Sequence, residues 1–381
     1  MPAQVVATLP RAWLLPIALV AFVLVAPPAH MAAQQVSSSQ IQNPSSLMQI
    51  LPVRGNIYVL QGAGANITVS IGRDGVLMVD SGLASMGEQV LAAIRRLQNQ
   101  IDLRDKPPGW GAETRSSVAS RNIETPAKPI RYIINTHVHP DHVGANELLR
   151  RSGMTFTGGN VAGNISDAGE GAAIMAHEAV LNRMTSTAGG ATPAPADAQP
   201  TDTYYTDTMK LSHFFNGEGV QLIHQPAAHT DGDTLVWFRG SDVIAAGDLF
   251  STTTYPVIDV KQGGSINGVV EGLNRILRYC IAEFRTEGGT LVIPGHGRLS
   301  DSADVAYYRD MVTILRDRVS AMVAKGLTLA QVKAAKPTAD YEPRYGATSG
   351  PWTTDQFIEA AYVSLGGGKA AAPKPAPGRS K

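Results

Sequence analysis

The stretch THVHPDH, at residues 136–142, concentrates four strong metal ligands in one short segment. They are His137, His139, Asp141 and His142. The stretch follows an apolar, β-branched run, Ile130 to Ile134, which predicts a buried strand. Imidazole and carboxylate together suit zinc, and also iron or manganese. A strand that runs into a short loop presents such side chains as one group, so the pattern predicts a metal site.

The same design recurs three times further along the chain, where a hydrophobic run ends in turn-forming residues and one candidate ligand. Val220 to Ile223 precedes His229, Val243 to Ala246 precedes Asp248, and Leu291 to Ile293 precedes His296. Glycine beside a site lets the backbone approach closely, and loops on a rigid sheet hold ligands in fixed geometry. Seven candidate ligands at four strand ends therefore predict one shared site.

Together with Asp80, which follows the run Val76 to Val79, these residues make the chain resemble the metallo-β-lactamase superfamily from about Leu51 to about Leu299. The resemblance implies an α+β fold, a four-layer αββα sandwich with a two-metal centre on one edge and additional C-terminal helices. In the family pattern, His137, His139 and His229 bind the first metal, and Asp141, His142 and His296 bind the second. Asp248 bridges both metals, and Asp80 supports the site without binding metal.

Two cations about 3.5–4 Å apart can share a water molecule and lower its pKa toward neutrality. We therefore expect two Zn²⁺ per chain, with iron or manganese as alternatives, and a metal-activated hydroxide that cleaves a small ester, thioester, lactone or lactam bond. Asp141 and Asp248 are the predicted catalytic carboxylates. Asp141 can bind metal through one oxygen and carry a proton on the other.

Two other activities remain open at this level: a β-lactamase that confers antibiotic resistance, and an iron-containing oxidoreductase of the same fold. A non-enzymatic metal-binding protein is a further alternative. Asp248 matches the bridging aspartate of the broader hydrolase family better than the metal sets of dedicated β-lactamases. The single cysteine, Cys280, lies on a predicted helix with Ile276 and Phe284, which argues against the β-lactamase subclass with a cysteine ligand and against a thiol-handling enzyme.

The composition is that of a globular protein with one sizeable core. Lys and Arg number 32 against 32 Asp and Glu, so the net charge gives no electrostatic footprint for nucleic acid. We expect a small-molecule substrate and no nucleic-acid partner, and the composition leaves the oligomeric state open.

The N-terminus predicts export. Arg11 precedes an apolar run of about fifteen residues, Ala12 to Ala26, whereas a bilayer span needs about twenty. Residues 1–33 are therefore predicted as a signal peptide, cleaved after Ala29 or Ala33, and an uncleaved anchor is the alternative. The mature protein is expected in the periplasm or outside the cell, without stable membrane association.

The rest of the chain divides by composition. We expect a flexible segment at 34–50, the metallo-β-lactamase-like domain at 51–300, C-terminal helices packed on it at 301–365, and a disordered tail at 366–381. Residues 102–128 and 158–171 look like insertions, and 185–203 like a linker. Helices are predicted over about 87–98, 304–324, 328–335 and 353–365. His177 is predicted at a strand-to-helix junction, and His224 in a packing or supporting role. The expected pocket loops are 62–66, 250–255 and 261–265.

Export can be tested by sequencing the N-terminus of the protein recovered from the periplasm or the medium. We expect the mature chain to begin after Ala29 or Ala33, because the apolar run is too short to span a bilayer comfortably. An intact Met1 in a membrane fraction would show that the segment is an anchor.

Overall fold

The computed structural model describes residues 48–104, 129–154, 171–281 and 288–367. The predicted signal peptide, nearly all of the segment 34–50, most of both insertions and most of the tail lie outside the described residues. Within these residues, no helix combines the length and the apolar composition needed to cross a membrane.

The first sheet has seven strands that lie side by side in chain order. They are β1 (Gln49–Arg54), β2 (Ile57–Ala63), β3 (Ala65–Gly72), β4 (Gly75–Val79), β5 (Ile130–Ile134), β6 (Ala173–His177) and β7 (Asp202–Tyr204). The first four strands pair antiparallel, and β4 to β7 pair parallel. The predicted strand at 130–134 is therefore confirmed as β5.

The second sheet has six strands in the order β13-β12-β11-β10-β9-β8. They are β8 (Thr208–Lys210), β9 (Val220–Gln225), β10 (Asp233–Phe238), β11 (Val243–Ala245), β12 (Leu291–Ile293) and β13 (Ser300–Asp301). All neighbours are antiparallel except β11 and β12. The hydrophobic runs before His229, Asp248 and His296 are thus confirmed as strands.

The α-helices of the described residues are α1 (Gly87–Arg104), α2 (Pro140–Val143), α3 (Asn146–Arg151), α4 (Glu178–Met184), α5 (Ile266–Tyr279), α6 (Ser302–Ala324), α7 (Leu329–Ala334), α8 (Glu342–Tyr345) and α9 (Thr354–Ser364). The predicted N-cap Thr328 is confirmed, and Thr353 caps α9 in the same way. Each forms a capping box with a glutamine three residues later. The threonine side chain accepts from the backbone N–H of the glutamine, and the glutamine side chain accepts from the backbone N–H of the threonine. α1 continues beyond the predicted end at 98, as far as Arg104.

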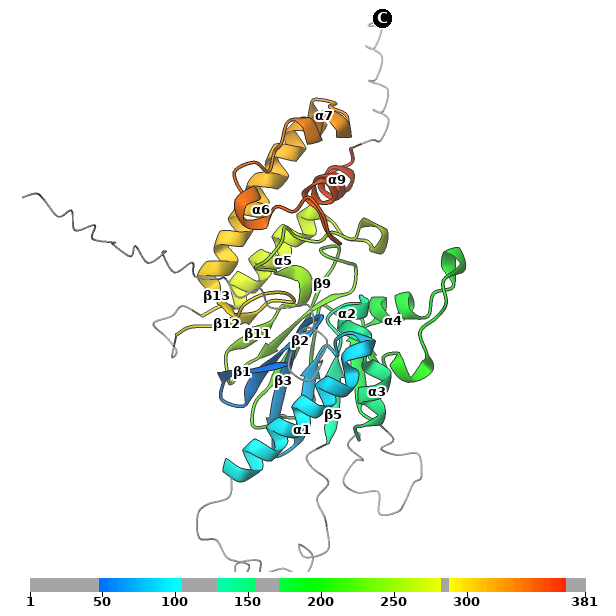
Figure 1. Ribbon diagram of the computed structural model, residues 1–381, viewed down its shortest axis with the longest axis vertical. Coiled ribbons are helices and arrows are strands. Elements are labelled where there is room, and N and C mark those ends of the chain that lie inside the picture. The colour runs from blue at the N-terminus through cyan, green and yellow to red at the C-terminus, as the bar shows by residue number, and fades with distance from the viewer. Residues whose placement is uncertain (1–47, 105–128, 155–170, 282–287, 368–381) are drawn as a thin grey trace, which may run out of the picture. The chain divides into compact units, whose positions relative to one another are not determined.

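The alternation of side chains along the strands builds the four layers. In β4, Val76 and Met78 pack in the core under α1 and α3, whereas Leu77 and Val79 pack between the two sheets. In the second sheet, Ile244 faces the core that α5, α6 and α9 complete. Successive strand residues point to opposite faces, so each sheet buries one face on helices and the other on its partner sheet. Figure 1 shows α1 and α3 on one side of the strands and α5 on the other, and the predicted αββα sandwich is confirmed.

The ends of several strands meet at one edge of the sandwich. β9 and β11 both run antiparallel to β10, and β12 runs parallel to β11, so all three point the same way. The backbone N–H of Thr234 at the start of β10 donates to Thr136 O beyond β5, over 2.8 Å, and Asn66 N–H donates to Gly295 O, also over 2.8 Å. These bonds join the loops of the two sheets, so the loops with candidate ligands lie together.

Two expectations need correction. The predicted linker at 185–203 is held in place, since Ala198 is buried and its carbonyl accepts from Asn146 Nδ2 over 2.9 Å. Contacts from elsewhere in the fold order a segment that has little apolar surface of its own. The helix predicted through Cys280 ends at Tyr279, and Cys280 is its half-buried C-cap, where burial raises the pKa of the thiol to about 12. Phe284 lies outside the described residues.

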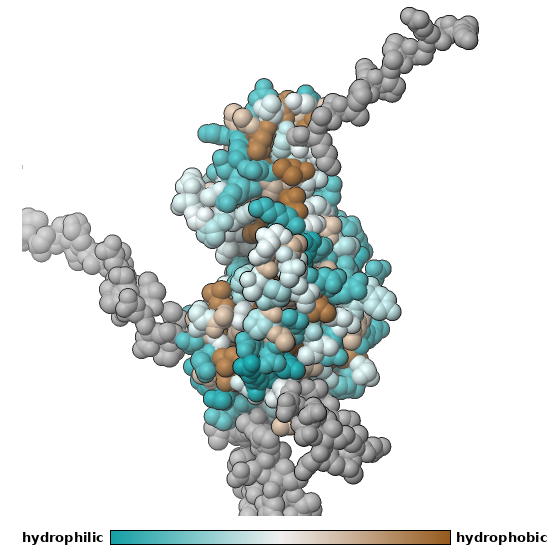
Figure 2. Space-filling view, turned by 90° about the vertical axis from the view of Figure 1, so that its right-hand side faces the viewer, coloured by the Kyte–Doolittle hydropathy of each residue, from teal (hydrophilic) through white to brown (hydrophobic). Residues whose placement is uncertain are grey.

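The surface carries no large apolar face in the view of Figure 2, where hydrophobic residues emerge as separate patches among hydrophilic ones. The large hydrophobic side chains that are exposed within the described residues are Leu51, Leu83, Met154, Tyr205, Phe214, Tyr307, Ile314 and Val363. Scattered exposure of this kind is ordinary for a folded domain.

Replacing Leu77 tests the layer between the sheets. Leu77 is 0% exposed, so we expect Leu77→Ala to lower the free energy of unfolding by about 3 kcal/mol, because it removes buried methyl groups and leaves a cavity. The control is Leu51→Ala on β1, where the side chain is 37% exposed and the loss should be small. Equal losses in urea denaturation of the two variants would contradict the assignment.

Candidate metal centre

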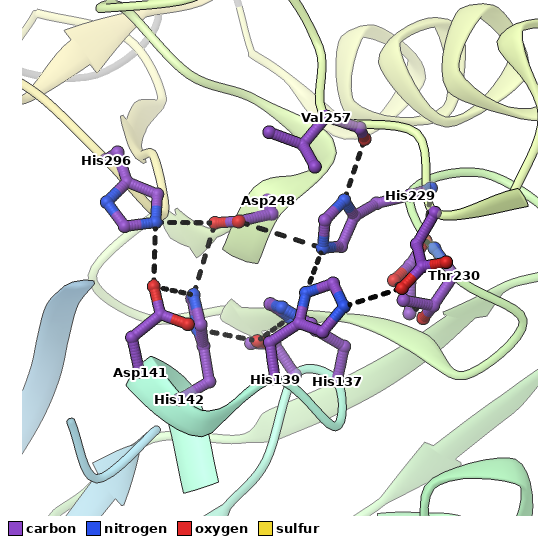
Figure 3. A network of polar contacts seen from close by, with 12 residues as sticks. His137, His139, Asp141, His142, His229, Thr230, Asp248, Val257 and His296 are labelled. Carbon is purple, nitrogen blue, oxygen red and sulfur yellow. Dashed lines mark hydrogen bonds and ion pairs between the residues drawn. The ribbon is translucent and has the colours of Figure 1, made fainter. Parts of the chain in front are cut away.

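The seven predicted ligands come together at the shared edge of the two sheets, and in Figure 3 their side chains point toward one another. The segment after β5 supplies four of them. The loop after β9 supplies His229, the short turn after β11 supplies Asp248, and the loop after β12 supplies His296. Residues up to 159 positions apart in the chain thus meet in one cluster, as the sequence pattern predicts.

His137, His139 and His229 form the first group. One ring nitrogen of each lies within 4.8 Å of the corresponding atoms of the others. The closest pair is His229 Nε2 and His139 Nδ1, at 2.9 Å. The rings stand nearly perpendicular to one another, with interplanar angles of 90°, 88° and 80°. Three nitrogens therefore converge on one small space.

Asp141, His142 and His296 form the second group. Asp141 Oδ2 lies 3.2 Å from His296 Nε2 and 3.7 Å from His142 Nε2. Two imidazoles and a carboxylate thus face a second point beside the first.

Asp248 stands between the two groups. Its Oδ1 lies 3.2 Å from His142 Nε2 and 3.5 Å from His296 Nε2, and its Oδ2 lies 3.7 Å from His229 Nε2. One oxygen faces each group, which is the arrangement that a bridging carboxylate requires. Asp248 also belongs to a third possible group with His137 and His142.

Three imidazoles of the cluster form a hydrogen bond through the ring nitrogen that faces away from it, and these bonds fix their tautomers. His229 Nδ1–H donates to Val257 O over 2.7 Å, His139 Nε2–H to Asp259 Oδ2 over 3.1 Å, and His142 Nδ1–H to Asp80 Oδ2 over 2.7 Å. A carbonyl or a carboxylate can only accept, so the hydrogen sits on the outward nitrogen of each ring. The inward nitrogen of each neutral ring then carries a lone pair.

The inward atoms are arranged for a cation. The lone pairs of His229 Nε2 and His139 Nδ1 face each other at 2.9 Å, which is unfavourable unless a positive charge lies between them. Among the described residues, the inward His137 Nε2 is buried and has no hydrogen-bond partner, whereas the buried His142 Nε2 and Asp248 Oδ1 face each other at 3.2 Å. Buried polar atoms rarely stay unpaired without a functional reason. The nitrogen and oxygen donors therefore fit a divalent metal ion.

The electrostatics favour the same interpretation. Burial, followed by the charge of His142, holds the pKa of His137 well below its usual value of 6.5. Burial lowers the pKa of His229 to about 4, and Asp248 offsets only part of that effect. Both rings are therefore neutral near pH 7, the form that binds metal.

The pKa values of His142 and His296, which face carboxylates, are shifted in the opposite direction. Burial opposes the charge of His142, yet Asp248 and Asp80 together raise its pKa well above 6.5. Burial is again outweighed at His296, where hydrogen bonds to Asp141 and Asp248 raise the pKa to about 9. A cation binding here would displace these protons.

Asp80 lies where its predicted supporting role requires. Its carboxylate is buried and accepts from the Thr136 N–H and hydroxyl, each over 2.8 Å, as well as from His142. Its φ of 66° places it in the left-handed region, which is strained for a residue other than glycine. This backbone conformation directs the carboxylate toward Nδ1 of His142, the ring nitrogen that faces away from the cluster.

Asp259 is a supporting residue that sequence reasoning missed. It follows His229 by thirty residues, in no motif, and its Oδ1 caps a short 3₁₀ turn (Val260–Gln262) while its Oδ2 accepts from His139. The only signal in the sequence was an aspartate before a turn, and this signal is weak because caps of this kind are common. Carboxylates behind a ligating imidazole fix the ring and raise its basicity.

His177 and His224 lie apart from the candidate groups, and neither belongs to any group of converging ligand atoms within the described residues. Their rings stack on each other at 3.5 Å, and His224 Nε2–H donates to Asp231 O over 2.9 Å. His177 lies at the end of β6 and caps α4, so its predicted strand-to-helix position is confirmed. Nearby Asp233 accepts from the backbone N–H of His229 over 2.7 Å and shapes the turn.

Glycine is required at position 295. A Cβ there would collide with the Asp248 carboxylate and with the Gly247 backbone. The loop before His296 is further held by Asn66 Nδ2, which donates to Pro294 O over 2.9 Å. Asn66 thus positions this loop. Phe250 and Tyr255 are fully buried core residues, so the expectation that the ends of 250–255 line a pocket is wrong.

Asp259→Asn isolates the effect of the carboxylate behind His139. The asparagine oxygen can keep the cap of the 3₁₀ turn, but its NH₂ would meet the His139 N–H donor to donor. We expect the affinity for Zn²⁺ to fall by about 10–100-fold, measured by competition with a chelator. The control is Asp231→Asn, because the Asp231 carboxylate pairs with Arg183 instead. Unchanged affinity in Asp259→Asn would contradict the role.

Solved structures with the same arrangement of strands and helices include a stereoselective inverting sec-alkylsulfatase, Pisa1, from Pseudomonas sp., at 16% identity and a TM-score of 0.52. That match covers 87% of this chain and 52% of the alkylsulfatase, so this chain spans about half of that protein. The DIM-1 metallo-β-lactamase is 16% identical over 70% of this chain and 97% of its own, with a TM-score of 0.46. A metallo-β-lactamase from Pontibacter korlensis is 13% identical over 70% of this chain and 99% of its own, with a TM-score of 0.47. At 16% identity, the match to the alkylsulfatase shows a shared fold and nothing finer.

The comparison with curated proteins gave no match. The family model described as the metallo-beta-lactamase superfamily matches residues 52–296. This range runs from the second half of β1 to the loop after β12 and contains all seven candidate ligands, from His137 to His296. The chain therefore belongs to the metallo-β-lactamase superfamily.

Proposed function

We propose that this protein is a hydrolase that holds two divalent cations, zinc in the first instance, and cleaves a small ester, thioester, lactone or lactam bond. The observation that carries the proposal is Asp248, which directs one carboxylate oxygen at each of two groups of converging donors. The buried inward Nε2 of His137 supports it, because this atom has no hydrogen-bond partner among the described residues and a cation would supply one.

In the proposed site, each of the two groups of residues holds one cation. His137, His139 and His229 would hold one cation, Asp141, His142 and His296 the other, and Asp248 both. Two cations so held supply a nucleophile at neutral pH from shared water and polarise the oxygen of the bond to be broken. The carboxylates of Asp141 and Asp248 offset part of the charge of the two dications.

The exposed fractions of the candidate ligands support an approach of the substrate from one side. The side chains of His296, Asp141 and His139 are 34%, 28% and 20% exposed, whereas those of His142 and His229 are 0% exposed. The entrance is therefore bordered by His296, Asp141 and His139. Asp141 is the most accessible carboxylate of the cluster and can pass a proton between the reacting group and solvent.

Export and a small-molecule substrate are parts of the same proposal. The apolar N-terminal run supports export to the periplasm or the medium, where a hydrolase of small molecules would meet its substrates. A neutral net charge supports a substrate other than nucleic acid.

A hydrolysis panel tests the activity. Mature protein loaded with Zn²⁺ is offered esters, thioesters, lactones, β-lactams, alkyl sulfates and phosphodiesters, and the metal content is measured on the same sample. We expect turnover of at least one ester, thioester, lactone or lactam, and its loss with a chelator. Turnover of β-lactams alone would identify the β-lactamase alternative. No hydrolysis by protein with two bound ions, or a redox activity that follows iron content, would overturn the proposal.

Three substitutions test the division of roles. We expect His229→Ala to abolish turnover because the first group loses a donor, and Asp248→Ala to abolish it because the two groups lose their shared ligand. His224→Ala should retain most turnover and metal, since His224 contacts Asp231 O and His177 instead. The measurements are metal stoichiometry and turnover for all three. If Asp248→Ala keeps two ions and full turnover, the bridging role is wrong.

A further inference from the structure

A groove of about 750 Å³ opens beside the candidate metal centre. One wall comes from the loop that carries Asp259, with Val257, Ile258 and Val260. The opposite wall comes from the C-terminal part of the chain, with Trp352 before α9 and Ala360 and Val363 on it. Residues about a hundred positions apart in the chain thus form one groove, with apolar side chains from both segments among polar and charged ones.

The groove is continuous with the candidate centre. His139, a candidate ligand, and Asp259, the carboxylate behind it, both line the groove. His139 is one of the three partly exposed ligands that border the entrance, so a molecule in the groove would reach the reacting point past His139.

The residues that line the groove indicate which class of ligand it can bind. Val363 is 43% exposed although it is apolar, and Ala360 and Ile258 lie almost fully buried at the groove floor. The charged side chains of the lining include Lys261 and Glu359, which are exposed and opposite in sign. The volume falls in the range of about 300–1,000 Å³ that is usual for small ligands, which argues for a small molecule instead of a protein segment.

The C-terminal wall lies outside the part of the chain that the family shares. The family match ends at residue 296, whereas Trp352, Ala360 and Val363 come after it. The common part of the fold supplies the metal ligands, and the C-terminal helices of this particular chain supply half of the groove. A preference for one substrate class can therefore reside in these residues.

We propose that the groove binds the hydrocarbon chain of the substrate, so that the enzyme cleaves a hydrolysable polar group joined to an unbranched alkyl or acyl chain. This inference rests on the proposed function for the bond that is cleaved. The chain lies between Val257 and Val260 on one side and Trp352 and Val363 on the other, and the polar group reaches the centre beside His139.

Binding and turnover are measured separately along a chain-length series. Zinc-loaded protein is titrated with alkanoates from acetate to dodecanoate by calorimetry, and kcat/KM is measured for the p-nitrophenyl esters of the same acids. Each methylene that enters the groove should tighten binding by roughly fourfold, until the groove is filled. Tryptophan emission should change on binding of dodecanoate, and Trp352→Phe should remove that change.

Val363→Asp places a charge in the groove at an exposed position, and Ile314→Asp, on α6 and 40% exposed, is the matched control outside it. We expect Val363→Asp to remove most of the dependence on chain length while acetate binding stays as in the wild type, and Ile314→Asp to leave both unchanged. Trp352→Ala should weaken long-chain binding as well, which keeps the test valid if Val363→Asp folds poorly.

The two proposals can fail independently. Hydrolysis of short esters with no dependence on chain length, or equal dependence in Val363→Asp and the wild type, would overturn the groove proposal and leave the hydrolase standing. Binding that tightens with chain length, without hydrolysis of any ester, would support the groove and count against the hydrolase.

Discussion

The structure depends on one electrostatic constraint: lone pairs and carboxylate oxygens are buried facing one another. His229 Nε2 and His139 Nδ1 meet at 2.9 Å, and Asp248 Oδ1 lies 3.2 Å from His142 Nε2. The outward hydrogen bonds to Val257 O and Asp259 keep the inward nitrogens of His229 and His139 free of hydrogen when these rings are neutral. Such an arrangement is stable only with positive charge at its centre, as protons or as metal. The folding of this edge and the binding of a cation are therefore coupled.

The sandwich supplies the rigidity that this constraint requires. Each sheet has one face on helices and one on the other sheet, and the strand ends are tied across the layers by Thr234 to Thr136 and by Asn66 to Gly295. Loops held at both ends on a packed sheet can keep donors in unfavourable proximity, whereas a mobile loop would relax away. The absence of space beside Gly295 and the positive φ of Asp80 are local signs of the same constraint.

The C-terminal helices form one side of the groove that we propose for the substrate chain. They share a core with the second sheet, and α9 reaches back to the loop that carries Asp259, so the two sides of the groove are fixed relative to each other. Asp259 belongs to both regions, since it orients His139 and lines the groove. Asp259 therefore connects the groove wall with the candidate metal centre.

The sequence by itself determined the strands that precede the candidate site residues, the helix starts at Thr328 and Thr353, and the set of seven candidate ligands, because hydrophobic periodicity, capping and ligand type are local properties. It also indicated Asp80, through the family resemblance. Only the tertiary structure decided that Asp259 and Val257 orient His139 and His229, that the segment around Ala198 is ordered, and that Phe250 and Tyr255 belong to the core. It alone brought Trp352 and Val363 beside the centre. The physical reason is that hydrogen bonds and packing between distant segments depend on how the two sheets and the C-terminal helices close on one another, and no local pattern encodes that closure.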